Sequence, residues 1–194
     1  MAVDEPPHRA DEPPHPAGPG SVSATSPREP AQPAQPDTRT LRLIIRTDGA
    51  ARSNPGPASA GAVLIDAARP DARNPLAPAL ASISDYLGVQ TNNVAEYTAT
   101  VRALRLAAEL GAREVHLMLD SKLIVEQVHG RWKVKDAKLQ PLHADARRLL
   151  AGFARWTAVH VPRAQNKAAD ALCNEAIDRA QAGGPISVVR RPTG

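Results

Sequence analysis

The pattern of apolar and polar residues predicts three β-strands in the first half of the chain, and the first of them alternates at Leu41, Leu43 and Ile45. They run from Leu41 to Asp48, from Ser59 to Ile65 and from Leu80 to Val89. Residues 49–57 between the first two segments are rich in glycine, proline, serine and asparagine, which favour turns. Because short loops join the three strands, we expect them to be antiparallel neighbours.

Helical spacing of apolar residues begins after Thr91-Asn92-Asn93, whose side chains suit a helix N-terminus, and Gly111 is expected to end this helix. The rest of the pattern predicts two strands and three helices, at Val115–Leu119, Ser121–Val128, Leu142–Phe153, Thr157–Val161 and Asn166–Ala182. Strands that follow helical crossovers should run parallel to the first strand. The predicted fold is therefore α/β, with a five-stranded mixed sheet flanked by helices.

The ends of the chain differ in composition from this patterned region. Residues 1–40 hold ten of the 19 prolines and few large apolar residues, so we expect a disordered tail. We expect an ordered domain over residues 41–182 and a flexible tail over residues 183–194. The sequence leaves open whether a partner docks on residues 1–40.

The charge of the chain is also uneven. Residues 1–40 carry three arginines against six acidic residues, and subtracting this −3 from the formal net charge of +4 leaves +7 on residues 41–194. This excess is compatible with a polyanionic partner and equally with ordinary solubilising charge.

The remaining global features exclude several classes of protein. Cys173 is the only cysteine, so no intrachain disulfide forms, and we expect a small buried thiol rather than a nucleophile. No apolar run is long enough to span a membrane, and the N-terminus lacks the pattern of a signal peptide. We therefore expect a cytoplasmic protein, as a monomer with no membrane partner.

Four acidic residues occupy positions that the predicted fold brings toward one edge of the sheet. Asp48 and Asp120 end two strands predicted to be parallel neighbours, and Glu96 and Asp170 lie in the first turns of helices. Each alone is explained by turn or helix-dipole chemistry. Together, four carboxylates would repel one another unless divalent cations with oxygen ligands held them. Two such ions can catalyse phosphodiester hydrolysis.

The motifs that carry these residues resemble type 1 ribonuclease H over roughly residues 41–180. They are Thr47-Asp48-Gly49 with Ser53-Asn54-Pro55-Gly56, Thr91-Asn92-Asn93-Val94-Ala95-Glu96, Leu119-Asp120-Ser121 and Asn166-Lys167-Ala168-Ala169-Asp170. The resemblance implies a ribonuclease H-like fold, a metal cluster of Asp48, Glu96, Asp120 and Asp170, and two Mg²⁺ ions, with Mn²⁺ as a substitute. It implies hydrolysis of the RNA strand of an RNA–DNA hybrid, which leaves 3′-hydroxyl and 5′-phosphate ends.

The resemblance also assigns substrate contacts. Asn54, Asn92 and Asn93 match positions that contact the hybrid in the minor groove, where RNA 2′-hydroxyls are recognised. Thr91 matches a position near a phosphate pocket for the DNA strand. From the residues alone, turn and cap chemistry is the favoured explanation for all four.

A basic run after residue 130 is a further candidate contact with nucleic acid. It contains one aromatic residue, and its members are Arg131, Trp132, Lys133, Lys135 and Lys138. Lys133 suits phosphate and Trp132 suits a sugar or base, although a core position for Trp132 is equally compatible with the sequence.

One position departs from the pattern of many bacterial members. They carry a Gly-His pair after the fifth strand, whereas this chain has Arg163 on a short loop. In this respect it resembles the subgroup without the histidine, which includes archaeal and some bacterial members. Arg163 is a candidate contact for the scissile phosphate or a surface ion pair. Alternative functions are a nuclease of the same fold for RNA duplexes or junctions, and a non-catalytic hybrid-binding module.

Overall fold

A computed structural model describes residues 40–192, so the predicted tail over residues 1–40 lies almost entirely outside the described part. The elements follow the predicted order, with a short 3₁₀ turn before the last helix and one strand at the end added. They are β1 (Arg42–Ala51), β2 (Gly56–Asp66), β3 (Ala81–Gln90), α1 (Asn92–Glu109), β4 (Glu114–Leu119), α2 (Lys122–Val128), α3 (Leu139–Ala151), β5 (Arg155–His160), the 3₁₀ turn η1 (Arg163–Gln165), α4 (Lys167–Gln181) and β6 (Ser187–Arg190).

The strands form one mixed sheet in the order β5-β4-β1-β2-β3-β6. β1, β2 and β3 are antiparallel neighbours, while β4 runs parallel to β1 and β5 parallel to β4. The predicted arrangement of the first five strands is confirmed. β6 pairs antiparallel with β3, where the sequence predicted a flexible tail over residues 183–194. Four residues are too few to display a period, so only the pairing defines this strand.

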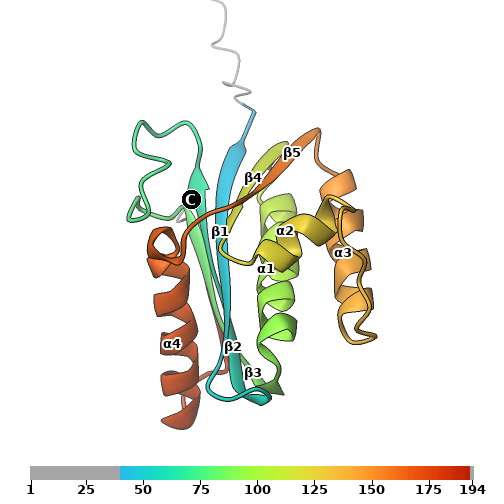
Figure 1. Ribbon diagram of the computed structural model, residues 1–194. Helices are drawn as coiled ribbons and strands as arrows, with labels where there is room; N and C mark the ends of the chain where they lie inside the picture. Colours follow the sequence, from blue (N-terminus) through green and yellow to red (C-terminus); the bar gives the residue numbers. More distant parts are fainter. Residues whose placement is uncertain (1–39, 193–194) are drawn as a thin grey trace, which may run out of the picture. The chain divides into compact units, whose positions relative to one another are not determined.

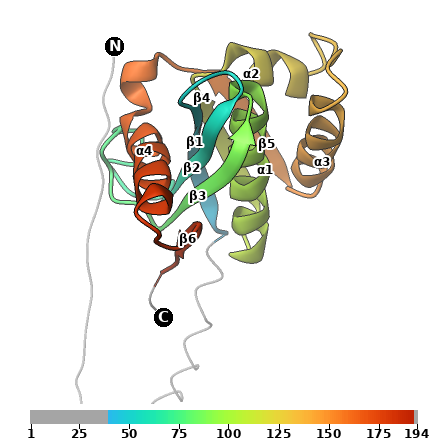
Figure 2. The same cartoon turned by 90° about the horizontal axis from the view of Figure 1, so that it is seen from below.

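Helices cover both faces of the sheet, with α4 on one face and α1 and α3 on the other (Figures 1 and 2). Alternation along β1 explains the two layers. Leu43 and Ile45 are fully buried in the large core that includes α1, and Ile44 lies in a smaller cluster that Leu172 of α4 covers. The central strand is therefore buried from both sides.

Local signals set the helix boundaries. The hydroxyl of Thr91 accepts a hydrogen bond from the Val94 amide and caps α1, as its residue type predicted. Gly111, at φ +78°, follows this helix. Within residues 40–192, no helix has the length and apolar character needed to cross a membrane.

Candidate active site

Asp48 lies on the central strand, beside the end of its parallel neighbour. Pairing of β1 with β4 ends at Thr47 and Leu119, so Asp48 and Asp120 are the next residues on adjacent strands. The sequence placed Asp48 at the end of its strand, but β1 continues to Ala51 through its pairing with β2. Asp48 is only 4% exposed. The parallel pairing therefore brings two carboxylates side by side at the carboxyl edge of β4.

A close approach of α1 to β1 brings in Glu96. A Cβ added to Gly49 would lie 2.0 Å from the Glu96 amide nitrogen, so only glycine permits this contact. The Asn92 side-chain amide donates to the Glu96 carboxylate at 2.9 Å. Glu96 is thus held in the second turn of the helix, facing the strand that carries Asp48.

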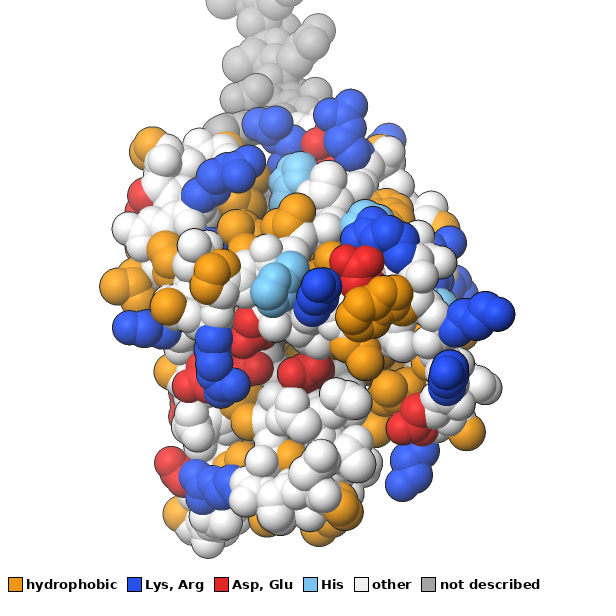
Figure 3. Space-filling view, viewed as in Figure 1, with side chains coloured by type: hydrophobic (Ala, Val, Ile, Leu, Met, Phe, Trp, Pro, Cys, Tyr) orange, Lys and Arg blue, Asp and Glu red, His pale blue; other side chains and the backbone are white. Residues whose placement is uncertain are grey.

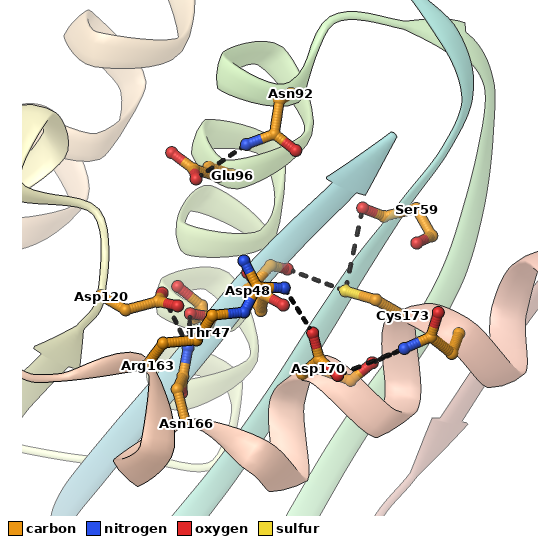
Figure 4. Close-up of polar contacts among 11 residues, drawn as sticks. Thr47, Asp48, Ser59, Asn92, Glu96, Asp120, Arg163, Asn166, Asp170 and Cys173 are labelled. Atoms are coloured by element: carbon orange, nitrogen blue, oxygen red, sulfur yellow. Dashed lines mark hydrogen bonds and ion pairs between the residues drawn. The ribbon is translucent and has the colours of Figure 1, made fainter. Parts of the chain in front are cut away.

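A similar approach on the other face of the sheet brings in Asp170. A Cβ added to Gly61 of β2 would lie 2.2 Å from the Ala169 carbonyl oxygen of α4. Asp170 lies in the first turn of this helix. Figure 4 shows Glu96, Asp120 and Asp170 around Asp48 on β1, each from a different part of the chain.

The electrostatics of Asp48 reflect this crowding. Burial, above all, raises its pKa to about 7, and the charges of Asp120, Asp170 and Glu96 add to the rise, while Arg163 opposes it. Burial also raises the pKa of Glu96, against hydrogen bonds from Ser121 and Asn92 that lower it. Asp48 therefore lies within electrostatic reach of all three other carboxylates.

These carboxylates have the donor chemistry of a divalent metal site. Hard cations such as Mg²⁺ prefer carboxylate oxygens, and the raised pKa of Asp48 marks negative charge that lacks a full counter-charge. Among the described residues, no three acidic, histidine or cysteine side chains converge closely enough to hold an ion as they stand. The four carboxylates therefore have the charge and the ligand atoms that a divalent metal needs. Their side chains must move closer together to bind one.

Arg163 supplies a positive charge at this cluster. Its guanidinium donates to the Asp170 carboxylate at 2.7 Å, and this hydrogen bond raises the pKa of Arg163. The side chain is 72% exposed. Arg163 is therefore exposed while bonded to one of the four acidic residues, and this places it where it can contact a substrate phosphate.

The sequence assigned no role to Asn166 or Arg46, although Asn166 contacts Asp120 and Arg46 lies two residues before Asp48 on β1. Asn166 is fully buried, and its Nδ2 donates to the Thr47 carbonyl at 2.7 Å and to the Asp120 carboxylate at 2.9 Å. Arg46 is also fully buried on β1. The sequence signals were an asparagine that opens the Asn166–Asp170 motif and an arginine in an apolar strand, and neither indicates its partners.

Cys173 packs behind Asp48. Its thiol donates to the Asp48 carbonyl oxygen at 3.2 Å, and burial raises its pKa to about 12. A thiol so far from ionisation is no nucleophile, and the expected buried position is confirmed.

The candidate minor-groove contacts gather at the start of α1. The Asn54 side chain accepts a hydrogen bond from the Asn92 amide at 3.2 Å, which holds the β1–β2 loop against the helix. Thr91 caps the helix, and Asn92 binds Glu96. Asn54 and Asn93 are exposed. The structure thus brings Asn54, Thr91, Asn92 and Asn93 together beside Glu96.

The candidate basic contacts lie on the loop after α2. Trp132 is 47% exposed, so it is a surface residue and not a core residue. The Lys122 ammonium lies 5.9 Å from the centroid of its ring, and Lys133 is exposed. In Figure 3, acidic side chains gather between α4 and the centre of the sheet, and basic side chains lie around them. This pattern suits a phosphodiester chain that passes over a metal site.

Comparison with known protein sequences gives matches of consistent character. A family model described as reverse transcriptase-like matches residues 46–176. Ribonuclease HI of Halobacterium salinarum is 44% identical over 133 residues, which cover 69% of this chain and 63% of that protein. A bifunctional protein of Mycobacterium tuberculosis is 43% identical over 140 residues, 72% of this chain and 36% of that protein. The chain thus spans less than two thirds of the length of either relative.

Comparison with solved structures agrees with the sequence matches, since it also finds ribonuclease H proteins. The N-terminal ribonuclease H domain of the mycobacterial protein is 43% identical, with a TM-score of 0.65, over 71% of this chain and 100% of that chain. LC11 ribonuclease H1, solved in complex with an RNA/DNA hybrid, is 40% identical, with a TM-score of 0.64, over 72% of this chain and 99% of that chain.

Proposed function

Because the chain belongs to the ribonuclease H family, we propose that it is an endonuclease that hydrolyses the RNA strand of RNA–DNA hybrids. The observation that carries the proposal is the cluster around Asp48 on β1. Burial raises the pKa of Asp48, and the charges of Asp120, Asp170 and Glu96 add to the rise, while Arg163 opposes it. A protein with no cation to bind would gain stability by replacing one of these carboxylates.

In this proposal, Asp48, Glu96, Asp120 and Asp170 hold two Mg²⁺ ions, for which Mn²⁺ substitutes. When bound, such ions activate a water and stabilise the charge that develops on the phosphate and the leaving oxygen. The oxygen of water joins phosphorus and the bond from phosphorus to the 3′-oxygen breaks, which leaves 3′-hydroxyl and 5′-phosphate ends. Asp48 must lose its proton before it binds a cation, so its raised pKa couples metal binding to proton release.

The surrounding residues position the hybrid. Asn54, Asn92 and Asn93 face the minor groove, where their amides detect the 2′-hydroxyls that distinguish RNA from DNA. Thr91 lies beside them at the helix start, where backbone amides favour a phosphate. Lys133 and Trp132 contact the second strand, and Arg163 contacts the scissile phosphate after it releases Asp170.

The test uses a labelled hybrid, a matched RNA duplex and a matched DNA duplex, each with Mg²⁺ and with EDTA. We expect only the hybrid to be cut, only with metal, into 5′-phosphate products. Asp48→Asn should lower the cleavage rate at least about a thousandfold while hybrid binding persists, since it removes the central ligand. Full activity of Asp48→Asn would refute the metal role of this residue. Cleavage of the RNA duplex alone, or binding with no product in Mg²⁺, would refute the proposed substrate or reaction.

A further inference from the structure

Two consecutive residues of β1 bind two consecutive residues just before α4. Arg46 donates through Nη1 to the Gln165 carbonyl at 2.9 Å, and the Thr47 carbonyl accepts from Asn166 Nδ2 at 2.7 Å. We name Arg46 and Asn166, with these contacts, the α4 clamp. It fastens the start of the helix that carries Asp170 to the strand that carries Asp48.

Arg46 is costly as a purely structural residue. It is 0% exposed, and burial lowers its pKa. No carboxylate among residues 40–192 lies within ion-pair distance of it, and its Nε has no hydrogen-bond partner. Its second terminal nitrogen donates to the Arg73 carbonyl at 2.9 Å, in the β2–β3 loop. An apolar side chain would be buried on this strand at lower cost, so core packing alone does not explain the arginine.

Asn166 is equally unusual for a residue at a helix start. An asparagine at the N-cap ordinarily accepts a hydrogen bond from a backbone amide of its own helix. Here the side chain makes no such bond, and its amide points to the sheet. Figure 4 shows it between Thr47 and Asp120. The backbone carbonyl of Asn166 accepts from the Asp170 amide at 3.1 Å. One buried residue thus links Asp120 through its side chain and Asp170 through its backbone.

We propose that Arg46 and Asn166 are positioning residues, which set Asp120 and Asp170 against Asp48 so that the cluster closes on metal. They act through these carboxylates and touch neither substrate nor the reacting atoms. The inference deepens the proposed function and rests on it. Residues that orient metal ligands in this way typically contribute ten- to a hundredfold to metal affinity or activity.

The primary test is calorimetric titration of the full chain with Mg²⁺ or Mn²⁺, without nucleic acid. We expect Asn166→Ala and Arg46→Met each to weaken metal affinity about ten- to a hundredfold. Arg46→Lys keeps the charge but cannot donate in the same fork to two carbonyls, so it should behave like Arg46→Met. Wild-type affinity in Arg46→Lys or in Asn166→Ala would overturn the proposal.

Arg179→Met is the matched control. Arg179 also donates to two backbone carbonyls, those of Ser84 and Pro185, but in the last turn of α4. Its side chain is 15% exposed. We expect the control to lose stability and to keep wild-type metal affinity. An equal loss of affinity in the control would show a general effect of stability and overturn the proposal.

A double-mutant cycle separates positioning from general loosening. If Arg46 acts through Asp170, Arg46→Met should change metal affinity less than about twofold in the Asp170→Asn background. An undiminished effect of Arg46→Met in that background would overturn the positioning role of Arg46.

Hydrogen exchange provides a readout independent of metal. The amides of Gln165, Asn166 and Asp170 should exchange faster in Arg46→Met and in the milder Asn166→Ser, but not in the control. Unchanged exchange at these amides would refute the clamp even if Asn166→Ala fails to fold.

The two proposals fail in different ways. If the wild-type protein binds metal but does not cut hybrids, the proposed function is wrong and the titrations still report on the clamp. If hybrids are cut and the clamp variants bind metal as the wild type does, the positioning role alone is wrong.

Discussion

At the scale of single residues, the site depends on a carboxylate kept where its charge is unfavourable. Asp48 is almost fully buried, and three acidic neighbours add to the effect of burial on its pKa. The sequence singled out all four acidic residues as candidates, because their places close to predicted strand and helix ends are local features. It could not show that the pKa of Asp48 would rise to about 7, since the burial of this carboxylate depends on the packing of α1 and α4 around it.

The first consequence concerns stability without metal. Folded Asp48 holds its proton up to about pH 7, whereas an ordinary aspartate releases it near pH 3.8. Its stabilising contribution is therefore fully present below pH 3.8 and is lost as pH rises through 7. In EDTA at pH 8, Asp48→Asn should exceed the wild type in unfolding free energy by roughly 2–4 kcal/mol.

Thermal or urea unfolding at pH 4 and pH 8 measures this difference, which should nearly vanish at pH 4. Asp178→Asn, at an exposed carboxylate of α4, serves as the control and should show no such gain. Equal stability of Asp48→Asn and wild type at pH 8 would contradict the unfavourable burial of this charge.

At the scale of elements, the site exists because two helices approach the sheet at glycines. Gly49 admits the start of α1, and Gly61 admits the start of α4. The sequence predicted these helices and that they pack on the sheet. It did not predict how near they come, because the approach depends on residues far apart in the chain.

Gly49→Ala tests the first of these approaches. The new methyl group would lie 2.0 Å from the Glu96 nitrogen and push α1 away, at a cost of about 1–3 kcal/mol in unfolding free energy. Because Glu96 moves with the helix, hybrid cleavage should fall about a hundredfold.

Gly152→Ala is the comparison variant, at the C-cap of α3, where the added Cβ meets only the Leu149 carbonyl at 3.3 Å. It should keep full activity and change stability by less than about 1 kcal/mol. A Gly49→Ala protein with wild-type activity would show that α1 can retreat without moving Glu96 out of the site.

The added strand β6 leads to another prediction. The Ser187 hydroxyl donates to Asp85 at 2.5 Å, and Asp85 is only 1% exposed. Ser187→Ala removes this hydrogen bond and leaves the carboxylate its ion pair with Arg102. The free energy of unfolding, measured in urea, should fall by about 1–3 kcal/mol. Cleavage should not change, because β2 and β3 separate β6 from β1, the strand that carries Asp48. Ser53→Ala, at an exposed loop serine, provides the control. Equal stability of the two variants would mean that β6 does not hold Asp85.

At the scale of the whole molecule, acidic and basic side chains occupy different parts of the face that carries the candidate site. Several acidic side chains gather near the centre of one face, with basic side chains beside and above them (Figure 3). The +7 charge of residues 41–194 indicated a polyanion only in general terms. The structure adds that Trp132 and Lys133 are exposed together on the loop after α2.

Salt dependence of hybrid binding tests the role of this loop. In EDTA, affinity should fall steeply between 50 and 200 mM NaCl, and Lys133→Gln should reduce the slope of log K against log salt by about 1. Arg148→Gln removes an exposed charge on α3 that already pairs with Asp145, so it should leave the slope unchanged. An unchanged slope in Lys133→Gln would remove this residue from the binding surface.

The sequence by itself determined the type and order of nine elements, the first five strands and the four α-helices, and it singled out the four acidic residues as the candidate site. These features depend on periods of two or 3.6 residues and on capping side chains, all encoded within a few positions. The tertiary structure alone decided that Arg46 is buried, that Arg163 binds Asp170, that Asn166 binds Asp120 and that Ser187–Arg190 form a strand. Arg46 and Gln165 are 119 positions apart, and no local period encodes such a contact. Its existence depends on closure of the whole sheet, which also brings the four carboxylates within reach of one another.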